Sequence, residues 1–161
     1  MKTFTYRQQI QHSDIGIIAE IVKSSGFFST EETDIALELA EEKLTQPHDS
    51  SYQFLFVEDE KKVVGYTCYG LIPATSSSYD VYWIVVSKDL RGQGLGKLLM
   101  AETEKLILQS GGRQVYVETS SRDQYKPTHK FYETCGYHQE AFLKNFYHDG
   151  DSKIIYAKVL K

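Results

Sequence analysis

The sequence predicts one mixed α/β domain in which helices cover both faces of a sheet. Segments with helical spacing of apolar residues alternate with short segments of strand character, in the order strand, two helices, three strands, helix, strand, helix, two strands. No repeat, low-complexity tract or linker interrupts the 161 residues. The hydrophobic share of 41% and the charged share of 25% are those of a globular protein. We therefore expect residues 1–161 to form a single domain.

The N-terminal part of the chain predicts a strand followed by two helices. Residues 3–9 suit a strand, and Ser13 precedes a helical pattern as a candidate N-cap. Ser29 and Glu32 have the spacing of a capping box, which predicts the start of a second helix that ends near Gln46. The apolar face of this second helix is expected at Ile35, Ala36, Leu39, Ala40 and Leu44.

Three strands should follow these helices. Residues 52–58 and 63–71 have strand composition and flank a polar turn at residues 59–62, which predicts a hairpin. A third strand is expected at residues 80–86. Because its run VYWIVV is apolar on both faces, we expect a central strand that is covered on both sides.

The C-terminal part predicts a helix, a strand, a short helix and two final strands. Gly111 and Gly112 should stop the first of these helices. Pro127 suits the first turn of the short helix, and Gly136 suits the position after its last turn. The five elements are expected at residues 95–109, 115–119, 127–135, 138–147 and 153–159.

Composition and charge argue against several kinds of partner. The net charge of −4, with both signs interspersed, provides no broad basic surface, so we expect no nucleic-acid partner. No stretch approaches the roughly 20 apolar residues of a membrane span, and residues 1–11 have no secretory h-region. The expectation is therefore a cytoplasmic protein with no membrane partner. Cys68 and Cys135 are expected to be free thiols.

The sequence contains no pattern typical of a metal site or of a catalytic nucleophile. Its five histidines have no H-x-x-x-H or cysteine partner at ligand spacing, so no metal is expected. No G-x-S-x-G turn or activated-cysteine motif is present in the sequence. Nucleophilic catalysis is therefore not expected.

The segment DLRGQGLGKLLM at residues 89–100 predicts an anion-binding site. A strand ending near Val86 runs through alternate glycines into a helix, whose first N–H groups have no intrahelical acceptor and point along the positive end of the helix dipole. Glycine lets this backbone approach a diphosphate closely. A dinucleotide fingerprint would need Gly or Ala in place of Lys97, and a Walker A loop would need Ser or Thr in place of Leu98. Neither of these two motifs fits.

Arg91, Gly94 and Gly96 instead form the pattern R-x-x-G-x-G directly after an apolar strand. This segment resembles the acyl-CoA pyrophosphate loop of the GNAT superfamily of N-acetyltransferases. The resemblance extends to VYVETSS at 115–121, similar to the family's next strand with its acidic residue, and to HKFYETCGY at 129–137, similar to the family's helix that ends in a tyrosine. It covers most of the chain from Tyr52 onward. It implies a mostly antiparallel sheet of about seven strands, splayed between strands 4 and 5, with four helices.

The resemblance also implies where acetyl-CoA, the expected cosubstrate, binds. The pantetheine arm should follow the backbone of Ile84, Val85 and Val86, and the pyrophosphate should lie on the glycine loop. Arg91 and Lys97 would supply positive charge near the phosphates. The loop residues implied to bind the cofactor are Arg91, Gly92, Gln93, Gly94, Gly96, Lys97 and Leu98.

Two residues resemble the catalytic groups of the family. Tyr132 has the place of the general acid in K-F-Y-E-x-x-G-Y, and a phenol with a pKa near 10 can protonate a departing thiolate. The alternative for Tyr132 is packing of its helix against the sheet. Glu118 resembles the acidic residue that serves as base, often through water, in some members. The alternative for Glu118 is to accept local N–H bonds at a strand end.

The sequence departs from the family pattern in the segment SSRDQYKP at 120–127. Many relatives carry an asparagine seven residues before the tyrosine, where this chain has Tyr125, and the spacing implies a two-residue insertion. The usual contact of that asparagine with CoA therefore has no assigned residue here. Arg122 and Lys126 are the substitutes that the segment offers.

Together these patterns predict an acetyl-CoA-dependent N-acetyltransferase that acts directly on a primary amine of a small-molecule or amino-acid-like acceptor. One alternative is acetylation of a protein N-terminus or lysine. Another is an acyl-CoA-binding module without catalysis, against which the pairing of Tyr132 with Glu118 argues. The sequence leaves the oligomeric state open, a homodimer included.

Overall fold

The structure is a computed structural model that describes residues 2–161, and these residues divide into two compact units. The first unit comprises the residues through Gly70 together with Trp83–Thr103, and the second comprises Leu71–Tyr82 and Glu104–Lys161. Over residues 2–161 the chain forms four α-helices and seven strands, which follow the order β1-β2-β3-β4-β5-β7-β6 in one sheet. The predicted mixed α/β fold is confirmed.

The strands are β1 (Thr5–Arg7), β2 (Gln53–Asp59), β3 (Lys62–Leu71), β4 (Ser78–Val86), β5 (Gln114–Ser120), β6 (His138–His148) and β7 (Asp151–Val159). The helices are α1 (Asp14–Ser24), α2 (Thr30–Thr45), α3 (Leu95–Gln109) and α4 (Lys126–Thr134). Short 3-10 turns lie at Lys88–Leu90 and Asp123–Tyr125. The predicted bounds of the helix at 95–109 are confirmed.

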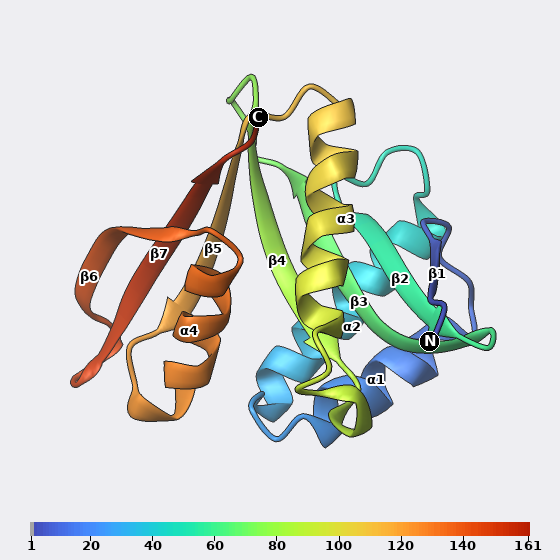
Figure 1. The fold of residues 1–161 in the computed structure, drawn as a ribbon, viewed down its shortest axis with the longest axis horizontal. Coiled ribbons are helices and arrows are strands. Elements are labelled where there is room, and N and C mark those ends of the chain that lie inside the picture. The colour runs from blue at the N-terminus through green and yellow to red at the C-terminus, as the bar shows by residue number, and fades with distance from the viewer. Residues whose placement is uncertain (1) are drawn as a thin grey trace. The chain divides into compact units, whose positions relative to one another are not determined.

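In the first unit, β1, β2 and β3 pair antiparallel and have helices on both faces. The hairpin turn between β2 and β3 places Glu60 and Lys61 at φ values of 49° and 67°, as a tight hairpin turn requires. In Figure 1, α2 lies behind these strands and the start of α3 lies in front of them. The hydroxyls of Thr67 on β3 and Thr103 on α3 are hydrogen-bonded at 2.8 Å. This bond ties the buried face of α3 to the sheet.

The core of the first unit lies between the strands and the pair α1 and α2. The rings of Phe54, Phe56 and Tyr66 stack with centroid separations of 5.9 to 6.1 Å. Burial of such aromatic side chains supplies much of the hydrophobic stabilisation of a small domain. The buried residues of α1 and α2 that belong to this cluster are Ile18, Ile21, Val22, Ala36 and Ala40.

In the second unit, β7 lies between β5 and β6 and is antiparallel to both. The start of β4 pairs in parallel with β5, from Ser78 opposite Gln114 to Asp80 opposite Tyr116. Helix α4 packs on one face of β5 and β7 (Figure 1), where the ring of Tyr132 lies 5.8 Å from that of Tyr156. This arrangement puts α4 on only one of the two faces of these strands.

Most of the predicted start and stop signals are confirmed. Ser29 and Glu32 form the reciprocal capping box, with N–H···O distances of 3.1 and 2.7 Å, and α2 ends at Thr45 with Gln46 as its C-cap. Gly136 has a φ of 91° just beyond the end of α4, a left-handed position that favours glycine. Both cysteines are free and buried, as expected.

Four local predictions are wrong. The first strand is shorter than residues 3–9, and Ser13 makes no side-chain cap bond, since its φ of −63° and ψ of −20° are already helical. Ile35 is exposed, since the buried stripe of α2 runs through Thr33, Ala36 and Ala40. The run in β4 is not covered throughout, as Tyr82 is exposed.

Candidate functional site

The predicted anion site lies in the first unit, where the loop after β4 enters α3. Gly92 and Gly94 have φ values of 77° and 79°, in the left-handed region that favours glycine. A Cβ at either position would meet none of the described atoms within 4 Å. The backbone conformation, rather than a lack of space, therefore calls for glycine at both positions, and the loop surface is open to a ligand.

The helix geometry decides which amides of this loop can face an anion. Helix α3 begins at Leu95, and the N–H of Leu98 already donates to the carbonyl of Gly94 at 3.1 Å. The N–H groups of the first three helical residues have no intrahelical acceptor. The amides of Leu95, Gly96 and Lys97 are therefore the ones directed at a ligand. The amide of Leu98, which was also expected at the pyrophosphate, donates to the carbonyl of Gly94.

The direction of the backbone groups of β4 decides which of them can bind a ligand. A Cβ on Gly65 of β3 would lie 2.9 Å from the carbonyl oxygen of Val85, so this carbonyl points toward β3. The N–H of Ser87 also points toward β3, where it donates to the carbonyl of Val64 at 2.7 Å. Because backbone groups alternate in direction along a strand, those of Ile84 and Val86 point away from β3. Of the three predicted pantetheine contacts, these two have the suitable direction.

Arg91 contacts the segment between α1 and α2. Its guanidinium lies over the ring of Phe27 at 5.2 Å and donates to the carbonyl of Ser25 at 3.4 Å. The next residue, Phe28, meets Trp83 of β4 edge to face, with ring centroids 4.9 Å apart. In this structure Arg91 therefore links the glycine loop to residues 25–28, a contact that the motif alone does not predict.

In the second unit, Tyr132 is buried on the inner side of α4. Its ring lies 5.5 to 6.0 Å from those of Phe131, Tyr137 and Tyr156. Burial raises the pKa of its hydroxyl well above 10. The phenol is therefore held protonated and has a proton to donate, although its ring also packs the helix.

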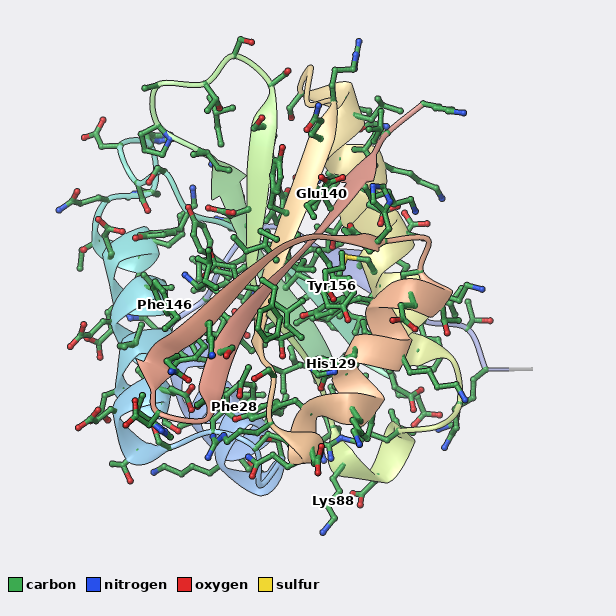
Figure 2. The ribbon with its side chains drawn as sticks, turned by 90° about the vertical axis from the view of Figure 1, so that its left-hand side faces the viewer. Phe28, Lys88, His129, Glu140, Phe146 and Tyr156 are labelled. Carbon is green, nitrogen blue, oxygen red and sulfur yellow. The ribbon has the colours of Figure 1, made fainter. Side chains whose placement is uncertain are left out.

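The neighbours of Tyr132 fix the position of α4. Nε2 of His129 lies 2.7 Å from the carbonyl oxygen of Ser120, and its ring lies 6.2 Å from that of Tyr156. Figure 2 shows His129 on α4 beside Tyr156 on β7. The hydroxyl of Tyr137 donates to Glu104 at 2.9 Å, and Glu104 also pairs with Lys158 at 2.7 Å. These contacts hold both ends of α4 against the strands.

Glu118 points to the opposite face of the strands from Tyr132. Tyr156, which Tyr132 contacts, pairs with Val117 of β5, whereas Glu118 pairs with Ile155. Since successive side chains of a strand alternate between faces, Glu118 lies on the face without α4. Its Oε2 is 2.9 Å from Nζ of Lys153. Glu118 is thus engaged by a cation rather than by local N–H groups.

A second carboxylate, which sequence reasoning missed, shares the face of Glu118. Asp80 of β4 lies opposite Tyr116, two residues before Glu118, so both side chains project to the same side. Burial, reinforced by the charge of Glu118 and opposed by that of Lys153, raises the pKa of Asp80 to about 6. The only sign of this site in the sequence is the acidic residue Asp80 at the start of a predicted strand. The pairing of β4 with β5, which brings Asp80 beside Glu118, could not be predicted from the sequence.

The segment 120–127 is held by its own ion pairs. Nε of Arg122 lies 3.3 Å from a carboxylate oxygen of the buried Asp151, and its guanidinium stacks over the ring of Tyr125 at 5.6 Å. Nζ of Lys126 pairs with Asp123 at 3.1 Å. Both candidate substitutes for the family asparagine therefore make intramolecular contacts within the second unit.

The described residues contain no further recognised chemical centre. Over residues 2–161, no group of three or more His, Cys, Asp or Glu side chains is arranged to hold a metal ion. No helix in this part of the chain has both the length and the apolar character of a membrane span. Burial also raises the pKa of the Cys68 thiol, so this cysteine is held as a thiol.

Comparison with known proteins gives a consistent result. The model of the Acetyltransferase (GNAT) family matches residues 18–137. A crystal structure of a protein from Desulfovibrio desulfuricans, assigned to the GNAT family of acetyltransferases, is 41% identical, with a TM-score of 0.95 over 98% of this chain and 99% of that one. No curated protein sequence matches the chain significantly.

More distant structures share the fold. An aminoglycoside 6'-N-acetyltransferase complexed with coenzyme A is 19% identical, with a TM-score of 0.78 over 98% of this chain and 96% of that one. A variant of the spermidine N-acetyltransferase from Vibrio cholerae is 18% identical, with a TM-score of 0.77 over 97% of this chain and 93% of that one.

Proposed function

The chain belongs to the GNAT family of acetyltransferases, and on this basis we propose that it transfers the acetyl group of acetyl-CoA directly to a primary amine of a small-molecule or amino-acid-like acceptor. The observation that carries the proposal is the family match over residues 18–137. This range includes the glycine loop, Glu118 and Tyr132. A related structure with bound coenzyme A supports acetyl-CoA as the cosubstrate.

The glycine loop is assigned to the pyrophosphate of acetyl-CoA. The amides of Leu95, Gly96 and Lys97 donate to the phosphate oxygens, and the dipole of α3 favours the negative charge. The exposed side chain of Lys97 adds a positive charge at the same helix terminus. The outward-pointing backbone groups of Ile84 and Val86 are assigned to the amides of the pantetheine arm.

Tyr132 is assigned the protonation of the departing thiolate. When the amine attacks the thioester carbon, the C–N bond forms, the C–S bond breaks, and the sulfur takes the phenolic proton. A hydroxyl that burial keeps protonated suits this step.

Proton removal from the acceptor amine is assigned to Glu118, with Asp80 beside it. An acceptor arrives as an ammonium ion and must lose a proton before it can attack. Two carboxylates on one face attract a cation, and a carboxylate whose pKa is about 6 is matched to proton acceptance near neutral pH. Lys153 places a positive charge beside Glu118, 2.9 Å from its carboxylate.

A small amine acceptor is favoured by these carboxylates and by the related enzymes that act on aminoglycosides and spermidine. An acceptor on a protein remains the second candidate, because an Ard1 protein and a ribosomal-protein-S18-alanine N-acetyltransferase share the fold.

The proposal is tested by incubating purified protein with acetyl-CoA and a library of small amines, amino acids and N-terminal peptides while free thiol is measured. We expect thiol release that depends on a small amine. Thiol release with peptides but not with small amines would favour a protein acceptor instead. Binding of acetyl-CoA by calorimetry, without release for any amine or peptide, would indicate a binding module.

A further inference from the structure

Lys153 of β7 contacts the carboxylate that is assigned to the acceptor amine, and the proposed reaction has no step for it. Its Nζ lies 2.9 Å from Oε2 of Glu118 and 4.0 Å from the centroid of the Phe146 ring. Lys153 pairs with Ser120, two residues after Glu118, so its side chain lies on the same face of β5 and β7. Only 14% of this side chain is exposed. A cation of the protein is therefore fixed beside the place where the acceptor ammonium is expected.

Three charged side chains interact on this face. The charge of Glu118 raises the pKa of Asp80 and the charge of Lys153 lowers it, so both groups are close to Asp80. When all three are ionised, two negative charges share one positive charge. One negative charge is left without compensation, and a single ammonium ion neutralises the cluster. Because Lys153 and Asp80 are partly buried, these charges interact more strongly than they would in water.

The next carboxylate on this face has its own cation. Asp151 lies two residues before Lys153 on β7 and therefore projects to the same side. Its carboxylate is 3.3 Å from Nε of Arg122 and 3.4 Å from Nε2 of His148, and it accepts a hydrogen bond from the hydroxyl of Ser120. Asp151 is thus engaged within the protein and does not provide a second site for an ammonium ion.

The strand neighbours of the charged cluster are apolar. Ile155 is the cross-strand partner of Glu118, and Leu143 is the cross-strand partner of Lys153. Leu143 and Phe146 are half-exposed. Such side chains can cover the uncharged part of an acceptor, whereas a second ammonium placed against them would lose water without gaining a partner.

We propose that Lys153 makes the protein selective for acceptors with one ammonium group and an uncharged, apolar body, and selective against diamines and polyamines. This inference rests on the proposed function. The ammonium of the acceptor binds at Glu118 and Asp80, and its apolar body lies against Leu143 and Phe146. Lys153 repels any further positive charge that the acceptor carries.

The test compares butylamine with butane-1,4-diamine as acceptors at low salt and about pH 8, where Asp80 is ionised. The two compounds have the same carbon chain and differ in the second ammonium. Thiol release from acetyl-CoA gives kcat/KM for each, and the ratio of the two values measures the selectivity. For the wild type we expect a ratio of at least about tenfold in favour of butylamine, because like charges in a partly buried site repel strongly. The ratio should fall at high salt.

Variants of Lys153 assign this selectivity to its charge. Lys153→Met keeps the length of the side chain and removes the charge, so the preference for butylamine should disappear or reverse. Lys153→Gln is a second neutral variant with the same expected result. Lys153→Arg keeps the charge and should keep the preference. Lys144→Met is the matched control, since Lys144 is exposed and follows Leu143 on β6, which places it on the other face.

The outcomes separate this inference from the proposed function. If the wild type uses butane-1,4-diamine as well as butylamine, or if both neutral variants keep the wild-type ratio, the inference is overturned while the N-acetyltransferase function stands. If no small amine is acetylated, the proposed function is overturned and the inference with it. Each ratio compares two acceptors in one protein preparation, so a partial loss of folded protein in a variant does not change it.

Discussion

Tyr132 and Glu118 lie on opposite faces of the strands β5 and β7. Tyr132 packs against Tyr156, which pairs with Val117, whereas Glu118 lies one residue further along β5 and projects to the other side. A protonated phenol and a carboxylate are therefore separated by the sheet itself.

Replacement of Tyr132 by Phe should lower kcat by about 10²-fold while the KM for acetyl-CoA hardly changes, because general-acid assistance is lost and the ring packing is kept. Burial raises the pKa of Tyr132 well above 10, so the wild type should show no loss of activity from its ionisation below about pH 10. Steady-state kinetics over this pH range provide the measurement.

Tyr137→Phe is the matched control for this variant. It removes a hydroxyl from the same cluster, but one that donates to Glu104. It should lower the free energy of unfolding by about 1–2 kcal/mol and leave kcat within a few-fold of the wild type. Equal kcat values for Tyr132→Phe and the wild type would assign the proton donor to another group.

The two carboxylates should be separable by their pH profiles. With a pKa of about 6 for Asp80, its ionisation should appear as an acidic limb in kcat/KM if it accepts the proton. Asp80→Asn would then remove that limb, while Glu118→Gln would keep it at reduced activity. If Glu118 is the base instead, Glu118→Gln should remove the acidic limb and Asp80→Asn should keep it. Glu118→Gln should then recover activity at high pH, where the acceptor amine is already neutral. A uniform loss at every pH for both variants would contradict a role in proton transfer.

Asp80→Asn should also stabilise the protein at neutral pH. The pKa of Asp80 is raised from 3.8 to about 6 in the folded state, so between these pH values the folded protein holds a proton that the unfolded chain has released. Stability from this group is therefore lost as the pH rises from about 4 to 6. Because the side chain is partly exposed, we expect a gain of about 1 kcal/mol in the free energy of unfolding at pH 7.5 and none at pH 4.

Urea denaturation at the two pH values measures this difference. Asp34→Asn, on the exposed face of α2, is the control and should show no such dependence on pH. An equal effect of Asp80→Asn at both pH values would mean that packing, rather than ionisation, explains it.

Gly94→Asp should raise the KM for acetyl-CoA strongly, because a carboxylate would lie beside the phosphates. Gly94→Asn is the matched control, since Asn has the same shape and also tolerates the φ of 79° at this position. We expect Asn to weaken cofactor binding much less than Asp, with the difference shrinking at high salt. Titration calorimetry measures the affinity of both variants for acetyl-CoA. Equal affinities would mean that repulsion between the new carboxylate and the phosphates does not explain the loss of binding.

Arg91→Met should reveal whether this residue serves the cofactor or the segment 25–28. If its contact with Phe27 matters most, Arg91→Met and Phe27→Leu should lower the free energy of unfolding by similar amounts, and the double variant should add little. If Arg91→Met raises only the KM for acetyl-CoA, and Phe27→Leu does not, the main role of Arg91 is to bind the phosphates of acetyl-CoA.

Local sequence signals determined much of this protein. The capping box of Ser29 and Glu32, the glycines at left-handed φ and the bounds of α3 follow from backbone chemistry that acts over a few residues. The glycine loop before a helix predicted an anion site for the same reason. The positions of Tyr132 and Glu118 in their elements were also predictable, because each lies within a short recognisable segment.

Strand pairing and burial decided the rest. Asp80 joins Glu118 only because β4 pairs with β5, which lies over thirty residues later in the chain. The amide of Leu98 donates to the carbonyl of Gly94, and the carbonyl of Val85 points toward β3, and both directions are set by the folded backbone. The raised pKa values of Asp80 and Tyr132 depend on desolvation. Desolvation is set by which side chains from distant segments surround a group, and no local pattern in the sequence encodes that.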